Sequence, residues 1–390
     1  MPQSLKIHFF AQCVHEQGTY FRFHNLAKAI FSQGHAITIH GLDFSSSASR
    51  RSETREGVSY EIINSFPGAR FFNPAINPIN VMRCGFLPRF KGDVAHLFQP
   101  FPAAYIGWKR SIATLKAYDW DDLWEGGFWR FAPRSLRNIY ERGVVGRLEK
   151  RLPKISNLTT TCSDYLEKMA RNRGAIHAAV VPNGVILGDG PSKEEARQAL
   201  GLKQDAFYVG FMGRTCDELE WCFDAMSASL SIRRDLRLAL CGVSWESLCG
   251  LSEDLLDRID FLGSLPYSEA RKFSYAIDLG LLPLEKNPFN ESRFPIKFAE
   301  YLGAGLPVLC SPVGECAKFS RYFLNGVISG GETREEWIKV FIHSVKNGPF
   351  ALPKPDKKNV SEILDWNKIA SDLLSAYKDG IESNLKKKLS

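Results

Sequence analysis

The 390-residue sequence has no pair of cysteines in the C-x-x-C pattern that zinc sites and redox motifs use. Its nine cysteines are scattered, and several stand in strand-like runs. The sequence therefore predicts small buried cysteines without a zinc site or a disulfide framework. No apolar run reaches the roughly 20 residues that a membrane-spanning helix needs, and no signal-peptide pattern opens the sequence. We expect a cytoplasmic protein.

Low-complexity blocks and dense basic tracts are also missing, so binding to nucleic acid is not expected. The net charge of +7 instead favours anionic partners such as nucleoside diphosphates, phospholipid surfaces or lipid-linked phosphates. A chain of 390 residues is too long for one ordinary core and suits two α/β domains.

The first half of the chain alternates strands and helices. A strand over residues 5–10, a helix over 19–33 and a strand over 36–41 predict a βαβ unit. Residues 65–91, rich in Pro, Asn and Phe, are expected to be irregular. Further strands are expected over 93–98, 112–118, 157–162 and 178–181.

The second half begins a fresh α/β alternation after a linker near residues 183–191. Its apolar runs, separated by helical stretches, predict a parallel sheet covered on both faces. In such sheets the ligand lies outside the carboxyl ends of the strands. An amphipathic helix is expected over 364–379. The strands are expected over 207–213, 236–242, 259–264, 278–284 and 306–311.

Residues 290–307, NESRFPIKFAEYLGAGLP, follow one of these strands and hold the strongest functional pattern. Pro295 suits the first position of a helix, whose N-terminal N–H groups and partial positive charge can receive a phosphate. Lys297 and, one turn later, Glu300 stand in the order less favourable for helix stability. A lysine on a phosphate and a glutamate on ribose hydroxyls would explain that order; the alternative is a solvated surface pair.

This segment resembles the donor-binding helix of GT-B glycosyltransferases, in the variant P-x-K-x-x-E-Y-[LM]-x-x-G-x-P-V of a pattern found in glycosyltransferase family 4. In that superfamily the glutamate holds the ribose of the nucleotide, and the lysine of this variant approaches the diphosphate. The matching residues are Pro295, Lys297, Glu300, Tyr301, Leu302, Gly305, Pro307 and Val308.

Other segments resemble the superfamily in the same order along the chain. Residues 18–39 resemble its glycine loop and first helix, and VPNGV (181–185) resembles the end of its N-terminal domain. FMGR (211–214) resembles the start of its C-terminal domain, and residues 365–377 resemble its final helix.

The resemblance implies a GT-B architecture, in which two Rossmann-like domains face each other across a cleft that holds the donor sugar. Residues 1–185 would form the acceptor-binding domain and residues 186–365 the nucleotide-sugar-binding domain. Residues 366–390 would form a helix that crosses back to the first domain.

Two positions depart from the commonest family 4 pattern. Ser292 stands where many members have a first glutamate, and Leu219 stands where they have a lysine. Both residues normally touch the diphosphate or the donor sugar, so donor identity and stereochemistry do not carry over. Arg214 and Lys297 would share the phosphate charge instead.

The donor-binding candidates therefore come from three places in the chain. An ordinary helix cap is the alternative for the Gly-Thr pair, and a surface arginine is the alternative for Arg214. The candidates are Gly18, Thr19, Arg214, Ser292, Arg293, Phe294, Pro295, Ile296, Lys297 and Glu300.

The catalytic candidates are Asp119, Asp121 and Asp122, which follow an expected strand. A carboxylate there could take the proton of an acceptor hydroxyl, or hold donor hydroxyls in a retaining reaction. The alternative is a helix N-cap cluster. We expect no metal, because GT-B enzymes neutralise the leaving diphosphate with basic residues and helix dipoles.

Residues 128–151, FWRFAPRSLRNIYERGVVGRLEKR, combine aromatic and basic side chains, and Trp108, Trp120 and Trp124 stand just upstream. Such a combination can hold a peripheral protein on an anionic membrane. The alternative is a solvated helix whose aromatic residues lie in the core. Membrane docking would place the protein at the inner face of the plasma membrane.

The expected activity is transfer of a sugar from a nucleoside diphosphate sugar, UDP- or GDP-linked, to a hydroxyl group of a glycan or lipid-linked acceptor. The resemblance suggests a hexosyltransferase-like enzyme (EC 2.4) of bacterial cell-envelope polysaccharide or glycoconjugate synthesis. A nucleotide-sugar epimerase and a non-catalytic nucleotide-sugar-binding module remain as alternatives.

Overall fold

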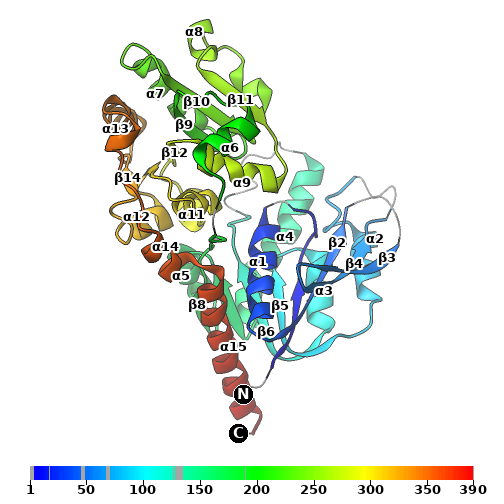
Figure 1. Cartoon of the computed structure of the whole chain (residues 1–390). Helices are drawn as coiled ribbons and strands as arrows, with labels where there is room; N and C mark the ends of the chain where they lie inside the picture. Colours follow the sequence, from blue (N-terminus) through cyan, green and yellow to red (C-terminus); the bar gives the residue numbers. More distant parts are fainter. Residues whose placement is uncertain are drawn as a thin grey trace. The chain divides into compact units, whose positions relative to one another are not determined.

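The computed structural model describes residues 4–16, 18–44, 49–66, 71–125, 127, 135–188 and 190–389. The chain divides into two compact units (Figure 1). The first unit consists of Met1–Pro182 and Trp366–Ser390, and the second consists of Asn183–Asp365. No helix within the described ranges is long and apolar enough to cross a membrane.

The first unit is built on an eight-stranded sheet in the order β3-β4-β2-β1-β5-β6-β7-β8. All neighbouring strands are parallel except the edge pair β3 and β4. The strands are β1 (Lys6–Phe10), β2 (Ala36–Asp43), β3 (Arg50–Arg55), β4 (Val58–Asn64), β5 (Lys91–Phe98), β6 (Ile112–Trp120), β7 (Leu158–Thr161) and β8 (Ala178–Val180).

Helices cover both faces of this sheet. Because successive strand residues point to opposite faces, Phe9 and Phe10 show which helices lie where. Phe9 packs on Phe98, which in turn meets Phe23 of α1. Phe10 faces the other way, against Gly107 of α3. The helices are α1 (Thr19–Ser32), α2 (Pro78–Gly85), α3 (Pro102–Arg110), α4 (Leu136–Ile155), α5 (Asp164–Asn172) and α15 (Trp366–Leu389).

The final helix, α15, belongs to the first unit and packs against α1 and β6. Ile369, Leu373 and Tyr377 recur at helical spacing and are buried. The Tyr377 hydroxyl lies 2.5 Å from Nδ1 of the buried His96. A Cβ on Gly380 would come within 2.7 Å of the Leu115 side chain, so glycine permits the close approach of helix and strand.

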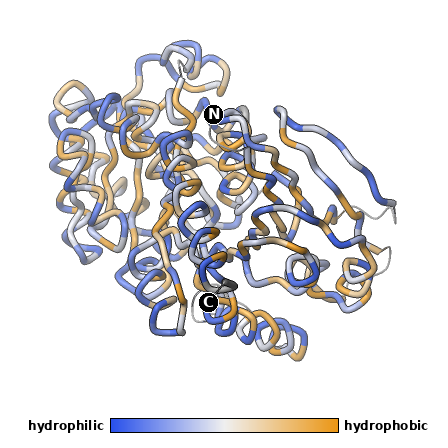
Figure 2. The backbone as a smooth tube through the Cα atoms, turned by 90° about the horizontal axis from the view of Figure 1, so that it is seen from below, coloured by the Kyte–Doolittle hydropathy of each residue, from blue (hydrophilic) through white to orange (hydrophobic). Residues whose placement is uncertain are grey.

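The second unit has a six-stranded sheet in the order β11-β10-β9-β12-β13-β14, and all its pairs are parallel. Figure 2 colours the backbone by hydropathy, and the strand sequences of this unit consist mainly of apolar residues, as burial on both faces requires. The strands are β9 (Phe207–Met212), β10 (Leu236–Cys241), β11 (Ile259–Gly263), β12 (Leu279–Leu282), β13 (Val308–Cys310) and β14 (Val327–Ser329).

Short helices connect these strands. After β12 the chain enters α10 and then α11, so these two helices follow the carboxyl end of that strand. The helices are α6 (Lys193–Leu200), α7 (Leu219–Ser229), η2 (Trp245–Leu248), α8 (Glu253–Leu256), α9 (Tyr267–Ala276), α10 (Pro288–Ser292), α11 (Ile296–Gly303), α12 (Gly314–Ser320), α13 (Arg334–Lys346), η3 (Pro349–Ala351) and α14 (Lys357–Leu364).

The expectation of an irregular segment over 65–91 is wrong in part, because α2 lies within it. The Asn77 side chain caps this helix by accepting a hydrogen bond from the Ile79 backbone N–H (2.9 Å), and Pro78 opens it. Strand β4 escaped prediction, and so did its partner, strand β3. It is a polar edge strand that turns into β4 through Glu56 and Gly57, both with positive φ (46° and 85°).

Replacing Leu373 with alanine is expected to destabilise the first unit by about 2–5 kcal/mol, because it leaves a cavity between α15 and the sheet. Urea unfolding followed by tryptophan fluorescence measures the effect. Asp372→Ala, on the exposed side of the same helix turn, is the control and should change stability by less than about 0.5 kcal/mol. Equal stability of the two variants would contradict the packing described here.

Candidate functional site

Three glycines line the carboxyl ends of neighbouring strands in the second unit. Gly213 follows β9, Gly242 follows β10, and Gly263 ends β11. The Gly213 N–H donates to the Cys241 carbonyl (2.9 Å), and the Gly242 N–H donates to the Gly263 carbonyl (2.7 Å). A Cβ on Gly242 would come within 2.9 Å of the Gly213 carbonyl oxygen, a backbone atom that cannot swing away. The result is a ledge of bare backbone, which we call the glycine ledge.

Lys297 lies beside this ledge, in the first turn of α11. Its Nζ is 2.6 Å from the place that a Cβ on Gly213 would occupy, and 4.3 Å from the centre of the Phe211 ring. Among the described residues it makes no hydrogen bond or ion pair. Burial lowers the pKa of Lys297, and the nearby Arg293 acts in the same direction, whereas Glu218 acts against them.

Glu300 lies one turn further along α11 and is partly open to solvent. Its Oε1 accepts a weak hydrogen bond from the Tyr267 hydroxyl (3.4 Å). Burial raises the pKa of Glu300 to about 7, although Tyr267, Arg271 and Lys297 act in the opposite direction. Lys297 and Glu300 do not form an ion pair with each other, so the carboxylate keeps hydrogen-bonding capacity for a ligand.

Two arginines add positive charge at the same end of the sheet. The Arg293 guanidinium lies over the Phe289 ring at 4.6 Å, and its buried Nε has no hydrogen-bond partner within the described ranges. Arg214 directly follows Gly213 and is exposed. Neither arginine has a carboxylate partner in the described part of the chain. Together with Lys297 they form a cationic group that a diphosphate would neutralise.

The loop before α11 is held by residues on its buried side. Ser292 donates its hydroxyl to the Phe289 carbonyl (2.9 Å), and the Phe294 side chain is buried. The Phe294 carbonyl accepts a hydrogen bond from Asn183 Nδ2 (3.0 Å), which anchors the loop to the VPNGV segment. Pro295 is the N-cap, so α11 begins at Ile296, one residue later than predicted.

Sequence reasoning missed two polar residues of this site. Tyr267 opens α9 after β11, a position at the carboxyl end of the sheet that could have indicated it. Glu218 is buried, and its Oε1 accepts a hydrogen bond from Asn290 Nδ2 (2.7 Å). Burial alone would raise the pKa of Glu218, but these hydrogen bonds lower it. Glu218 precedes Leu219, and no sequence signal distinguishes it.

In the first unit, both carboxylate oxygens of Asp119 accept hydrogen bonds from other side chains. Arg22 Nε and Nη2 donate to its two carboxylate oxygens, each at 2.8 Å, and the Thr160 hydroxyl adds a third bond at 2.6 Å. Burial alone would raise the pKa of Asp119, but Arg22 and these hydrogen bonds lower it. Arg22 was not among the predicted residues. No sequence signal distinguishes it, because its partner Asp119 lies 97 residues away along the chain.

The other first-unit candidates lie near the strand ends. Strand β6 continues through Trp120, so Asp121 and Asp122 follow it directly. Asp121 is buried 3.8 Å from Arg22, whereas Asp122 is partly exposed. Gly18 is the N-cap of α1, and a Cβ there would meet no atom within 4 Å. The Thr19 hydroxyl accepts a hydrogen bond from Gln99 Nε2 (3.2 Å).

The aromatic start of the predicted membrane-docking stretch, residues 128–134, lies outside the described residues. Its basic remainder forms α4, which Ser135 caps. The upstream tryptophans Trp108, Trp120 and Trp124 are all buried in the core of the first unit, as the alternative interpretation expects.

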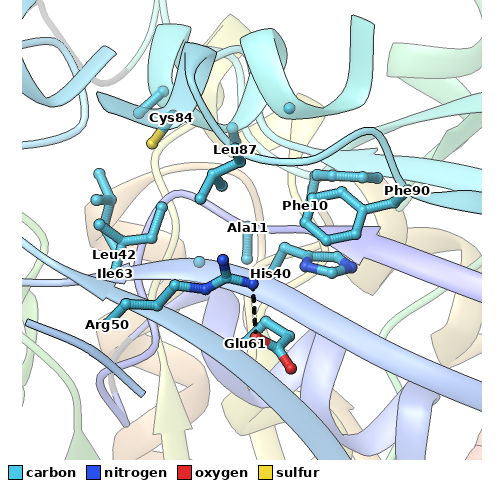
Figure 3. Close-up of a pocket in the computed structure, with 14 residues that line it drawn as sticks. Phe10, Ala11, His40, Leu42, Arg50, Glu61, Ile63, Cys84, Leu87 and Phe90 are labelled. Carbon is cyan, nitrogen blue, oxygen red and sulfur yellow. Dashed lines mark hydrogen bonds and ion pairs between the residues drawn. The ribbon is translucent and has the colours of Figure 1, made fainter. Parts of the chain in front are cut away.

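A separate hollow in the first unit lies between the sheet and helices α2 and α3 (Figure 3). Its lining is mainly apolar, and the guanidinium of Arg50 at its edge pairs with Glu61 (3.2 Å). His8 Nε2 donates to the backbone carbonyl at the start of β5, so His40 Nε2 must donate to His8 Nδ1. This leaves His40 Nδ1 as a buried acceptor, which suits no phosphate.

In the described ranges, no three His, Cys, Asp or Glu side chains gather as a metal site.

Comparisons with known proteins place these features in a class. Residues 203–347, which include the glycine ledge, Lys297 and Glu300, match the family of glycosyl transferases group 1. The chain is 23% identical over 298 residues to TuaH of Bacillus subtilis, named as a teichuronic acid biosynthesis glycosyltransferase, covering 70% of this chain and 68% of TuaH. It is 25% identical to the uncharacterised glycosyltransferase MJ1607 of Methanocaldococcus jannaschii, over 48% of each chain.

Solved structures show the same architecture. Sucrose-phosphate synthase from Thermosynechococcus elongatus matches with a TM-score of 0.70 at 15% identity, over 97% of this chain and all of that one. WaaG, a glycosyltransferase of lipopolysaccharide biosynthesis, matches with a TM-score of 0.59 at 14% identity, over 97% of this chain and 98% of that one. The fold is that of the GT-B proteins. With the family match, this confirms the prediction that the chain is a GT-B glycosyltransferase.

Replacing Asp119 with asparagine is expected to lower stability by about 3–5 kcal/mol, because Arg22 would keep a buried charge without its carboxylate. Thermal and urea unfolding measure the loss. Asp372→Asn, at an exposed aspartate of α15 in the same unit, is the control. If Asp119→Asn abolished turnover at unchanged stability, Asp119 would be a catalytic group rather than a structural one.

Proposed function

We propose that this enzyme transfers a hexose from a nucleoside diphosphate sugar to a hydroxyl group of a glycan or lipid-linked acceptor during cell-envelope polysaccharide synthesis. The observation that carries the proposal is the group of three cations beside the glycine ledge, none of which forms an ion pair with a carboxylate of the described residues. A diphosphate has the charge and the oxygen acceptors that this group lacks.

Each donor-site residue then has a definite role. Lys297 and Arg293 bind the diphosphate, together with the free N–H groups at the start of α11, and Arg214 adds charge from the end of β9. The glycine ledge lets the nucleotide approach the backbone closely. Glu300 accepts hydrogen bonds from the ribose hydroxyls, and Tyr267 orients its carboxylate. Ser292, Phe294, Pro295 and Ile296 hold the loop in place.

In the reaction, the acceptor oxygen forms a bond to the anomeric carbon, and the bond from that carbon to the phosphate oxygen breaks. The nucleoside diphosphate leaves with additional negative charge, which the cations and the helix N-terminus stabilise. The acceptor hydroxyl must lose its proton. Asp119 is occupied by Arg22, so we assign that proton to Asp122 or Asp121; Gly18 and Thr19 remain proposed donor contacts.

The substrate assignment draws on the relatives. TuaH and the similar TuaC are both named for teichuronic acid biosynthesis, which supports an envelope polysaccharide as the product. A trehalose-6-phosphate enzyme of the same fold is described with UDP-2-fluoro glucose, and starch synthase IV is described with ADP. We propose a UDP- or GDP-sugar as the donor, no required metal, and peripheral contact with the inner face of the plasma membrane.

Replacing Glu300 with alanine is expected to weaken binding of UDP or GDP by about 1.5–3 kcal/mol, because a charged hydrogen bond to ribose is lost. Isothermal titration calorimetry at pH 8 measures the change, and Glu362→Ala on exposed α14 is the control. The wild-type enzyme should turn over one member of a panel of UDP-, GDP- and dTDP-sugars. Nucleotide binding without hydrolysis or transfer would favour a non-catalytic module instead.

The affinity for UDP should rise as pH increases through about 7, where burial places the pKa of Glu300. The sign follows because only the deprotonated carboxylate accepts two hydroxyl hydrogen bonds, so binding below this pH must release a proton. Calorimetry in buffers of different ionisation enthalpy counts that proton. Glu300→Gln should remove this component and leave only the titration of the phosphate; an unchanged proton count would refute the ribose assignment.

A further inference from the structure

Helix α2 presents its largest apolar side chains to solvent, while the smaller Val81 and Cys84 contact the core. Asn80 and Cys84 are buried against the unit. Ile79 and Met82, with Phe86 just after the helix, recur at spacings of three and four residues along the opposite side. A surface helix of a soluble domain has the reverse arrangement, with its apolar side facing the core.

The apolar side chains continue onto the start of α4. The Phe72 ring connects α4 to Phe71 in the segment before α2, since it lies 4.9 Å from Phe71 and 5.0 Å from Tyr140. The Asn73 backbone N–H also donates to Glu141 of α4 (2.7 Å). Each residue of this apolar surface exposes at least 41% of its area. Its members are Phe71, Ile79, Met82, Phe86, Leu136 and Ile139.

The chain around this surface is strongly basic. Residues 65–118 contain seven Lys and Arg but a single acidic residue, Asp93, whose carboxylate accepts a hydrogen bond from the Lys6 backbone N–H (2.7 Å). The Arg110 guanidinium donates to the Leu87 carbonyl (3.4 Å), which places it at the end of α2, and the exposed Arg89 follows Phe86 by three residues in the sequence. This segment accounts for most of the net charge of the protein.

We infer that the apolar surface docks on an anionic phospholipid membrane. The Phe, Met, Ile and Leu side chains would enter the boundary between headgroups and acyl chains, and the arginines would contact headgroup phosphates. A second copy fits less well, because a symmetric contact would bring two basic segments together. The inference deepens the proposed function by giving the lipid-linked acceptor a surface on which the enzyme meets it.

Vesicle flotation of the full-length protein tests the surface. We expect binding to phosphatidylcholine vesicles that contain phosphatidylglycerol, and weaker binding as salt screens the charges. The double substitution Met82→Asp and Phe86→Asp should lower the partition coefficient about tenfold or more, since it places two charges at the hydrocarbon boundary. Leu324→Asp with Phe350→Asp, which alters two exposed apolar residues of the second unit, is the matched control and should bind as the wild type does.

Arg89→Glu with Arg110→Glu should reduce binding to the anionic vesicles and leave the weak binding to pure phosphatidylcholine unchanged. Equal flotation of the Met82/Phe86 variant and the wild type, or equal wild-type binding to neutral vesicles, would overturn the inference. A dimer in light scattering that the Met82/Phe86 variant loses would show instead that a second copy covers the surface.

UDP affinity, measured by calorimetry on the same variants, separates this inference from the proposed function. Each vesicle-binding variant should keep wild-type affinity and its unfolding midpoint, because the substituted side chains are exposed. Conversely, Glu300→Ala should lose UDP affinity and still float with anionic vesicles. If vesicle binding is refuted, the UDP measurements still test the proposed function, and the reverse also holds.

Discussion

Positive charge that no direct ion pair neutralises within the described residues governs the second unit. Lys297 and Arg293 are held in surroundings that desolvate them, and the carboxylate of Glu218 acts on Lys297 without pairing with it. Such an arrangement costs free energy in the empty protein and persists only where other packing holds it. Here that packing is the glycine ledge, the Phe211 and Phe289 rings, and the loop that Asn183 anchors. The cost is recovered when an anion binds, so the site is selective for a ligand with concentrated negative charge.

Asp119 shows the opposite use of the same kinds of groups. Arg22 and Thr160 satisfy its carboxylate completely, and the carbonyl of Val181 accepts a further hydrogen bond from Arg22 at 2.8 Å. The pair thus ties α1, β6 and the end of the first unit together. An aspartate at a strand end can be a catalytic base or a structural anchor. It can act as a base only if its carboxylate oxygens can still accept a hydrogen bond from a substrate.

The local sequence was sufficient to predict an element where an apolar periodicity and a motif indicated the same structure. Five strands of the second unit and the helix that carries Lys297 and Glu300 could be predicted to within a residue or two, because apolar runs and a proline mark them, whereas the short strand β14 was not predicted. Arg22 and Glu218 could not, because their importance depends on partners 97 and 72 residues away. Helix α2 was missed for a different reason. Its largest apolar residues, Ile79 and Met82, face outward, which inverts the usual placement of such side chains in a core-facing helix.

That inversion bears on how the enzyme would handle two anionic partners at once. A nucleoside diphosphate and an anionic lipid would compete if one basic surface served both. The chain instead divides its positive charge between residues 65–118, which flank an exposed apolar surface, and the cations beside the glycine ledge, which do not. The lipid-facing set combines charge with hydrocarbon contact, whereas the donor set combines charge with bare backbone and a carboxylate for ribose. Each partner is therefore recognised by a second feature that the other lacks, and membrane contact need not occupy the donor site.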